Sequence, residues 1–284
     1  MMCAWDKLME IIPPRMREPV NRMGRDTMQE FRLRESFPPE LVLQKSSYWL
    51  DDKCSREDIA FCLQSASRYS PWAADSLKKG YLTAPGGHRI GVCGQALYQK
   101  GQMMGIREPN SLCIRVARDF PGVGDRAPQE GSVLILGAPG WGKTTLLRDL
   151  IRLHSEAGIS VGVADERGEI AGCFQGAPQL DVGPCCDVIT GGNKAEALRL
   201  LLRAMSPRML ATDELGAPGE IAALAEALRW GVRLLATVHG GGLCDLRRRK
   251  TLSPLLGPGG FEQVVVLRGV GVPPEIEEAG KCGC

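Results

Sequence analysis

The amino-acid sequence predicts an α/β protein, in which a mostly parallel sheet with helices on both faces follows a smaller α+β domain. The first observation behind this prediction is a glycine-rich loop between an apolar run and a helical pattern, at residues 137–144. The second is the alternation of strand and helix patterns after this loop, which is typical of parallel sheets. The third is a series of short strand candidates, separated by turns, before residue 120.

A stretch rich in proline, glycine and charge, DFPGVGDRAPQEG at residues 119–131, separates the two parts of the chain. We therefore expect an N-terminal α+β domain over residues 1–120, a linker over residues 121–131 and a P-loop domain over residues 132–284. A chain of 284 residues with 44% hydrophobic content is long enough to bury a core in each domain.

The glycine-rich loop reads GAPGWGKT and matches GxxxxGK followed by Ser or Thr. Glycines let the backbone amides turn inward around a polyphosphate, and the following helix points its positive end at the same place. Lys143 is placed to reach the β- and γ-phosphates as a catalytic residue, and the Thr144 hydroxyl is placed to ligate Mg²⁺. The residues predicted to bind a nucleoside triphosphate are Gly137, Ala138, Pro139, Gly140, Trp141, Gly142, Lys143, Thr144 and Thr145.

Apolar runs and helical periodicity predict the elements around and after this loop. The expected strands cover residues 132–136, 159–164, 209–212, 233–237 and 263–267, and the expected helices cover residues 145–153, 194–205 and 218–230. Ligands bind at the carboxyl ends of strands in open α/β sheets. Polar residues that follow these strands are therefore candidates for the rest of the site.

Two acidic groups follow predicted strands of this sheet. Asp213 and Glu214 come directly after residues 209–212, as expected of a Walker B segment, so that Asp213 would hold Mg²⁺ directly or through water and Glu214 would polarise the attacking water. Glu166 lies in the acidic segment 165–169 and is a second candidate for the base. Sequence spacing leaves the choice between Glu166 and Glu214 open.

Thr237 and His239 end the strand predicted at residues 233–237, and Gly240 to Gly242 follow them in a turn expected to be mobile. Either side chain could sense the γ-phosphate through a hydrogen bond. A sensor of this kind distinguishes the two nucleotide states and couples hydrolysis to movement.

The N-terminal part predicts both helices and strands. Ser55 to Asp58 resembles a capping box that opens a helix to about Tyr69, and a second helix is expected from Ser70 to Gly80. The strand candidates are residues 81–83, 88–93, 95–98 and 112–117. The first 40 residues could form an amphipathic helix that binds a partner, although a helix packed on the protein's own core is favoured.

The composition limits the function classes. A net charge of +2 gives no support to polyanion binding, so no nucleic-acid partner is expected, and the basic run at residues 247–250 is read as a solvated helix face. No apolar stretch is long enough to span a bilayer, and a cytoplasmic protein is expected. The eleven cysteines are scattered without CxxC spacing, which favours reduced thiols.

Four segments in this order resemble the secretion-type (type II and IV) ATPases, a superfamily of P-loop NTPases with a RecA-like fold. GAPGWGKTTLLRDL is similar to their Walker A segment, VADERGEIAG to their acidic Asp box, ALRLLLRAMSPRMLATDE to their Walker B segment and LLATVHG to their His box. The chain from about Tyr81 onward, including YLTAPGGHRIGVCGQA and CIRVAR, resembles more narrowly the stage III sporulation family of these ATPases.

The resemblance implies an ATP-hydrolysing motor that forms a homo-oligomeric ring, usually a hexamer, with arginines lent by the N-terminal domain. The candidates for these arginines are Arg89, Arg115 and Arg118. The sporulation family implies docking on membrane proteins of a channel from mother cell to forespore, at the inner face of the membrane. One departure from the wider family is that Gly240 to Gly242 follow His239.

Three functions are therefore weighed from the sequence. The leading hypothesis is an ATP-hydrolysing motor assisted by Glu166 and Glu214. The second is an ATP-dependent switch or scaffold without significant turnover. The third is a nucleic-acid translocase, which the charge balance does not support.

Overall fold

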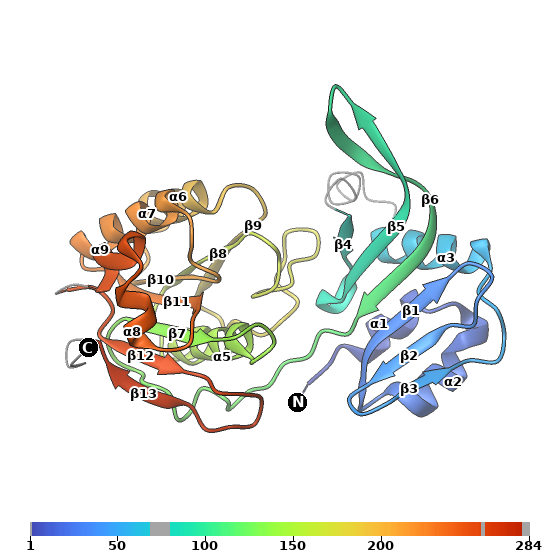
Figure 1. Ribbon diagram of the computed structural model, residues 1–284, viewed down its shortest axis with the longest axis horizontal. Coiled ribbons are helices and arrows are strands. Elements are labelled where there is room, and N and C mark those ends of the chain that lie inside the picture. Colours follow the sequence, from blue (N-terminus) through green and yellow to red (C-terminus); the bar gives the residue numbers. More distant parts are fainter. Residues whose placement is uncertain (1, 69–79, 257–258, 280–284) are drawn as a thin grey trace. The chain divides into compact units, whose positions relative to one another are not determined.

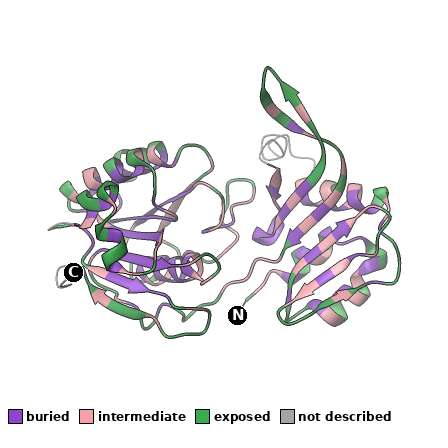
Figure 2. Cartoon of the chain, viewed as in Figure 1, coloured by how far each residue is buried: buried purple, intermediate pink, exposed green. Residues whose placement is uncertain are grey.

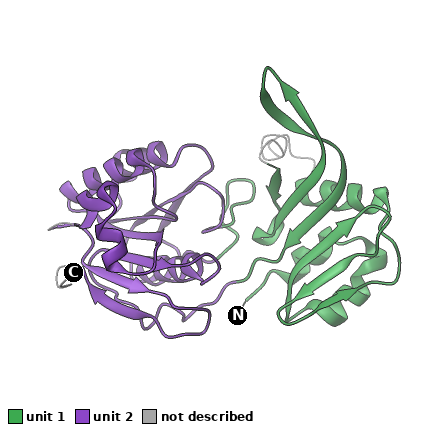
Figure 3. Ribbon diagram, in the orientation of Figure 1, with its two compact units in different colours: residues 1–118, 172–180 green, residues 119–171, 181–284 purple. Residues whose placement is uncertain are grey.

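The computed structural model describes residues 2–68, 80–256 and 259–279, and the chain divides into two compact units (Figures 1 and 3). Unit 1 contains residues 1–118 and 172–180, and unit 2 contains residues 119–171 and 181–284. Residues 119–131 thus belong to unit 2, where the backbone amides of Gly122 and Gly124 donate to the Asp149 carboxylate. Residues 172–180 belong to unit 1, where Gln179 accepts from the Gly86 amide.

Unit 1 is built on a six-stranded antiparallel sheet with the order β3-β2-β1-β6-β5-β4 (Figure 1). Its α-helices and strands are α1 (Trp5–Ile11), α2 (Pro14–Gly24), β1 (Met28–Arg34), β2 (Glu40–Leu43), β3 (Ser47–Trp49), α3 (Arg56–Ser67), β4 (Tyr81–Thr83), β5 (Arg89–Gln99) and β6 (Gln102–Arg115). A short 3₁₀ helix, Pro85–Gly87, joins β4 to β5. The antiparallel sheet and the helices packed on it give this unit an α+β architecture.

The N-terminal segment packs on the core of its own unit. Trp5, Leu8 and Ile11 of α1 and Met16 and Val20 of α2 are buried in the same apolar cluster as the inner face of the sheet. The segment does not stay helical, however, because β1, β2 and β3 follow α2 and extend the sheet. These three strands were not among the sequence predictions.

The long hairpin β5–β6 joins strands that the sequence predicted as separate. The candidates at residues 88–93 and 95–98 form one strand, whose register shifts between Cys93 and Gln95. Gly94 lies at this irregularity, and a Cβ there would come within 2.6 Å of the Glu108 carbonyl oxygen. The turn at Lys100 and Gly101 has positive φ at both residues, as a tight hairpin requires.

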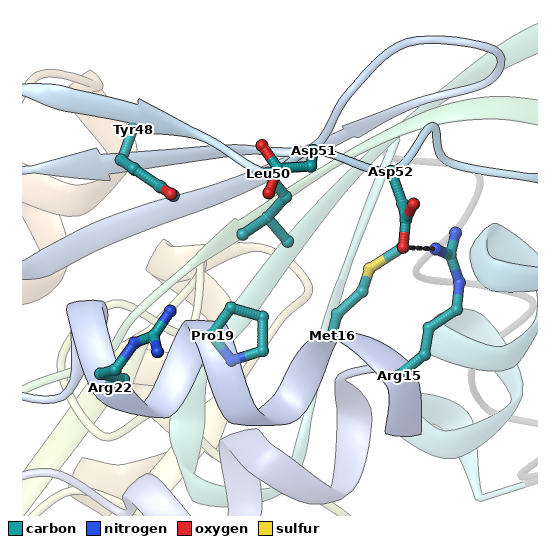
Figure 4. A pocket seen from close by; sticks show the side chains of 8 residues that line it. All are labelled: Arg15, Met16, Pro19, Arg22, Tyr48, Leu50, Asp51 and Asp52. Atoms are coloured by element: carbon teal, nitrogen blue, oxygen red, sulfur yellow. Dashed lines mark hydrogen bonds and ion pairs between the residues drawn. The ribbon is translucent and has the colours of Figure 1, made fainter.

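A small cavity of about 110 Å³ lies in unit 1 between α2 and the segment at residues 48–52 (Figure 4). Its lining consists of Arg15, Met16, Pro19, Arg22, Tyr48, Leu50, Asp51 and Asp52. Arg15 forms ion pairs with Asp52 at 3.4 Å and with Asp58 at 2.5 Å. Since Arg15, one of the two arginines in this lining, is already paired within the unit, we assign no ligand to this cavity.

Unit 2 is built on a seven-stranded sheet with the order β13-β12-β7-β11-β10-β8-β9. Its strands are β7 (Val133–Gly137), β8 (Val161–Asp165), β9 (Cys186–Thr190), β10 (Met209–Thr212), β11 (Arg233–His239), β12 (Gln263–Val266) and β13 (Glu275–Glu278). Its helices are α5 (Lys143–Glu156), α6 (Lys194–Ala204), α7 (Pro218–Arg229), α8 (Leu243–Arg247), η2 (Lys250–Leu252) and α9 (Ser253–Leu256). All neighbouring strands are parallel except β13, which runs antiparallel to β12.

Helices cover both faces of this sheet. Leu134 and Leu136 of β7 join an apolar cluster with α6, α7 and α9, while α5 lies on the opposite face (Figure 1). Strands covered on both faces read as continuous apolar runs, and every residue of β7, β8 and β10 is buried (Figure 2). The predicted mostly parallel α/β sheet is confirmed.

The register of four neighbouring strands, β7, β11, β10 and β8, brings their carboxyl ends to one edge. Gly137 of β7 pairs with His239 of β11, and Thr212 of β10 pairs with Ala236 of β11 and with Ala164 of β8. The segments that follow these strands therefore meet at one edge of unit 2.

Three further observations concern the described residues. The helix predicted to end near Tyr69 ends at Ser67, and the second predicted helix falls largely on residues 69–79, outside the described residues. Of the cysteines described, eight lie outside any disulfide, but Cys244 is disulfide-bonded, so the expectation of reduced thiols is wrong there. Among the residues described, no helix combines the length and apolar character that crossing a bilayer requires.

The capping box of α3 generates a stability prediction. The Ser55 hydroxyl accepts from the Asp58 amide at 3.3 Å, and the Asp58 carboxylate accepts from the Ser55 amide at 2.8 Å. We expect Ser55→Ala to lower the free energy of unfolding by about 1 kcal/mol, because one helix N–H group loses its partner. Urea unfolding followed by circular dichroism measures this loss. The control is Ser67→Ala near the helix end, and an equal effect of both variants would contradict the role of the cap.

Candidate active site

The glycine-rich loop connects β7 to α5 and has an open inner side. Gly140 has a φ of +77° and Gly142 a φ of +86°, which L residues other than glycine adopt only with strain. A Cβ at either position would meet no atom within 4 Å, so the glycines serve the backbone conformation and leave the loop accessible. The first turn of α5 contains Thr144 and Thr145 and no acidic residue. Its positive N-terminal end is therefore left uncompensated, as an anion site requires.

Lys143 is buried at the start of α5, and its ammonium group makes two contacts at the sheet edge. Its Nζ donates to the Ala138 carbonyl oxygen at 3.0 Å and lies 3.0 Å from Nδ1 of His239. Because an ammonium group only donates, Nδ1 of His239 is the acceptor and Nε2 carries the ring proton. Nε2 in turn lies 3.3 Å from Oε1 of Glu214. Burial lowers the Lys143 pKa, and the Glu214 charge opposes that effect.

Glu214 is the residue at which the contacts of the site converge. Its carboxylate contacts His239 through Oε1 and pairs with Arg167 through Oε2 at 3.0 Å. Its φ is +45°, a left-handed conformation that costs a residue other than glycine on the order of 1 kcal/mol. The Glu214 amide donates to Oγ1 of Thr237 at 2.8 Å, and the next amide donates to the Thr237 carbonyl oxygen. Thr237, which is fully buried, thereby supports the backbone of Glu214.

Asp213 has a buried carboxylate, and one of its two oxygens has no hydrogen-bond partner among the described residues. Only 2% of the residue is exposed, and Oδ2 has no hydrogen-bond partner in the part of the chain that the structure describes. Burial raises the Asp213 pKa from 3.8 to about 7, with Lys194 opposing and neighbouring carboxylates adding to the effect. A buried polar atom without a partner calls for an explanation, and a carboxylate oxygen suits a hard cation such as Mg²⁺. The residues present thus fit a magnesium site.

The acidic segment after β8 contains two kinds of carboxylate. Asp165 is fully buried and accepts the backbone amides of Glu169, Ile170 and Ala171, so it shapes the turn. The Glu166 side chain is 42% exposed, and its carboxylate lies 3.9 Å from the ammonium group of Lys194. Glu166 and Glu214 therefore both follow strands that end at the same edge.

Lys194 is a site residue that the sequence analysis missed. It begins α6 directly after the cap residue Asn193, and its Nζ donates to the backbone carbonyl oxygens of Asp213 and Glu214. A lysine in the first turn of a helix opposes the helix dipole. This unfavourable position was the one feature of the sequence that could have drawn attention to Lys194. Only the structure shows that the side chain is buried.

The three candidate arginines make contacts inside unit 1. Arg89 stacks on the ring of Tyr81 at 3.9 Å, Arg115 lies 3.5 Å from the Glu30 carboxylate, and Arg118 donates to the carbonyl oxygens of Arg25 and Met28 at 3.1 Å each. A role in stabilising a transferred phosphoryl group remains a prediction for each of them.

The fold and the site together define a P-loop NTPase domain of the RecA-like class. The sequence matches the family "Sporulation stage III, protein AA" over residues 5–280, and the chain belongs to this family. It is 35% identical over 277 residues to stage III sporulation protein AA of Bacillus subtilis (strain 168), covering 92% of this chain and 90% of that protein. It is also 28% identical to the uncharacterized protein ycf45 of Porphyra purpurea, covering 89% of this chain but only 43% of that protein.

Two solved structures share the fold. The ATPase DotB of Legionella pneumophila has a TM-score of 0.58 at 20% identity, covering 89% of this chain and 74% of DotB. The pilus retraction motor PilT, solved with bound ADP, has a TM-score of 0.61 at 15% identity, covering 95% of this chain and 81% of PilT. The predicted family and the predicted fold class are confirmed.

The raised pKa of Asp213 generates a prediction for stability without metal or nucleotide. The Asp213 pKa is about 7 in the folded protein and 3.8 in the unfolded chain. Between pH 4 and pH 7 the folded protein therefore binds a proton at Asp213 that the unfolded chain does not bind. The wild type therefore loses stability as pH rises through this window. We expect Asp213→Asn to raise the melting temperature at pH 8 and to leave it nearly unchanged at pH 5. Thermal unfolding in EDTA tests this, with exposed Asp125→Asn as control; a pH-independent difference would contradict it.

Proposed function

We propose that the protein is an ATP-hydrolysing motor of the secretion ATPase type, which binds ATP and Mg²⁺ at the carboxyl edge of unit 2. The observation that supports this proposal best is the unpartnered Oδ2 of Asp213, buried beside Glu214 at the edge where the P-loop begins. Family membership and the fold shared with DotB and PilT support the same function.

The residues of the P-loop would hold the phosphates. Backbone amides of the loop, except at Pro139, which has no N–H group, would bind the phosphate oxygens, and Lys143 would place its ammonium group on the β- and γ-phosphates. Thr144 and Asp213 would hold Mg²⁺, which when bound supplies positive charge to the phosphate oxygens. A phosphate oxygen bound to Lys143 would compete with His239 for the ammonium group, which would couple nucleotide binding to the contacts of His239.

Glu214 is our choice for the residue that polarises the attacking water. Its carboxylate is linked through His239 to the P-loop lysine, and its backbone is held from two sides. Glu166 is more exposed, and Lys194 lies near it at 3.9 Å. We assign Glu166 an electrostatic role, while His239 acts as the sensor because it contacts both Lys143 and Glu214. Thr237 supports that arrangement through the Glu214 amide.

The proposal extends to assembly and location. We propose a homo-oligomeric ring, hexameric as the sequence resemblance implies, in which Arg89, Arg115 or Arg118 supplies positive charge to a bound nucleotide. The ring would dock on membrane proteins of a mother cell-to-forespore channel during endospore formation. An ATP-dependent switch or scaffold without turnover is the second candidate, because the contacts of Lys143 with His239 support nucleotide sensing as well as hydrolysis.

Steady-state ATP hydrolysis with Mg²⁺, measured across protein concentrations, tests the motor. We expect turnover per chain to rise with protein concentration, and Lys143→Ala to abolish turnover and weaken ATP binding at least about tenfold, because a charged contact to phosphate is lost. Lys250→Ala, an exposed lysine of the same unit, is the control. Tight ATP binding by the wild type without turnover at any concentration would leave the switch or scaffold.

Substitution of each glutamate by glutamine tests which of the two is the general base. We expect Glu214→Gln to lower the turnover number by about 100-fold or more while ATP binding is retained, because a general base contributes roughly that factor. Glu166→Gln should lower turnover less than about tenfold, because a charge on a side chain that is 42% exposed contributes at most about 1 kcal/mol. Single-turnover hydrolysis and ATP titration of both variants give the comparison. A larger loss in Glu166→Gln would transfer the role of base to Glu166.

A further inference from the structure

Lys194 is a buried lysine that lies outside the four motifs compared with secretion ATPases. Its side chain is 6% exposed, and its Nζ donates to the Asp213 carbonyl oxygen at 2.8 Å and to the Glu214 carbonyl oxygen at 3.3 Å. Both carbonyl groups follow the last residue of β10. The backbone pairing of β10 with β8 and with β11 ends at Thr212, so these described strands donate no ladder hydrogen bond to the two carbonyl groups. The ammonium group thus supplies donors that the sheet does not.

The position of this lysine opposes its local preferences. A cation at the N-terminus of a helix is disfavoured by the helix dipole, and burial of a charge is costly. Three carboxylates compensate it, with Glu220 at 3.6 Å, Asp213 at 3.8 Å and Glu166 at 3.9 Å. A residue that breaks local rules and is compensated by its surroundings is a candidate for a functional role.

The backbone of residues 213–217 is held on all sides. The amides of residues 214 and 215 donate to Thr237, and the amides of residues 216 and 217 donate to Oε2 of Glu220 at 3.1 and 3.3 Å. Lys194 holds the carbonyl groups of residues 213 and 214 from α6. Of these contacts, the Lys194 contact is the one that links both carboxylate-bearing residues to a single charged group.

We propose that Lys194 is a positioning residue that fixes the backbone of Asp213 and Glu214, and with it the direction of both carboxylates. The inference rests on the proposed function of these carboxylates in ATP hydrolysis. Lys194 acts through the loop and would not touch the nucleotide. Its loss should therefore lower turnover while nucleotide binding by the P-loop is retained.

The test compares Lys194→Met, which keeps the length and apolar stem, with Arg203→Met on the exposed face of the same helix. We expect amide hydrogen exchange of residues 212–217 to rise about tenfold or more in Lys194→Met, because two charge-assisted hydrogen bonds are lost. We expect kcat to fall at least about tenfold with KM for ATP changed less than about twofold, as for a residue needed in the transition state. Lys194→Arg, which keeps the charge and the donors, should recover part of kcat.

Each outcome decides the proposal. Unchanged exchange at residues 212–217, or unchanged kcat with only a lower melting temperature, would overturn it. If Lys194→Met does not fold, Lys194→Gln is measured in the same way, and failure of that variant to affect exchange or kcat overturns the proposal. If the wild type shows no turnover, the proposed function fails, and the exchange measurement alone decides whether Lys194 positions the loop.

Discussion

Compensation of buried charge at the carboxyl edge of unit 2 is the constraint on which the site depends. Lys143, Asp165, Lys194 and Asp213 are all at most 6% exposed. Removing an ion from water costs several kcal/mol after relaxation, so each charge must find partners or change its protonation state. The fold meets this requirement differently at each of these residues.

Asp165 and Lys194 are compensated by groups that belong to the fold. Three backbone amides surround the carboxylate of Asp165, and two carbonyl oxygens with three nearby carboxylates surround the ammonium group of Lys194. Burial raises the pKa of both Asp165 and Asp213, but Asp213 has an oxygen without a hydrogen-bond partner among the described residues, and its pKa rises to about 7. A structural carboxylate would be expected to be fully hydrogen-bonded. The incomplete compensation of Asp213 is what a site for an added cation requires.

The parts of the site that the sequence predicted are those determined by local patterns. The P-loop is contiguous, and the pair Asp213 and Glu214 follows a strand whose burial is readable from its apolar run. Lys194 could not be predicted, because its partners are backbone carbonyl groups 19 and 20 residues away along the chain. Likewise, β1 was missed because its seven residues, MQEFRLR, mix charge with apolar side chains, and those side chains are buried only in the core that the other strands and the helices of unit 1 form. A contact between nucleotide and the candidate arginines of unit 1 could not be derived from local sequence patterns, because such patterns do not determine which arginine would reach a bound nucleotide.

The backbone conformation of Glu214 differs from that of Glu166, the other candidate for the base. A left-handed residue in a loop would ordinarily be glycine or asparagine, since either adopts this conformation at lower cost. At Glu214 the cost is met by the Thr237 hydroxyl on the amide side and by Lys194 on the carbonyl side. A glycine at this position would adopt the left-handed conformation without these hydrogen bonds. The presence of a glutamate therefore indicates that the carboxylate group itself is needed at this position. Glu166 has a φ in the ordinary range, and its exposed side chain carries no comparable support. The left-handed conformation of Glu214 thus supports the water-polarising role that we propose for it, and the Lys194 contact supports the positioning role that we propose for Lys194.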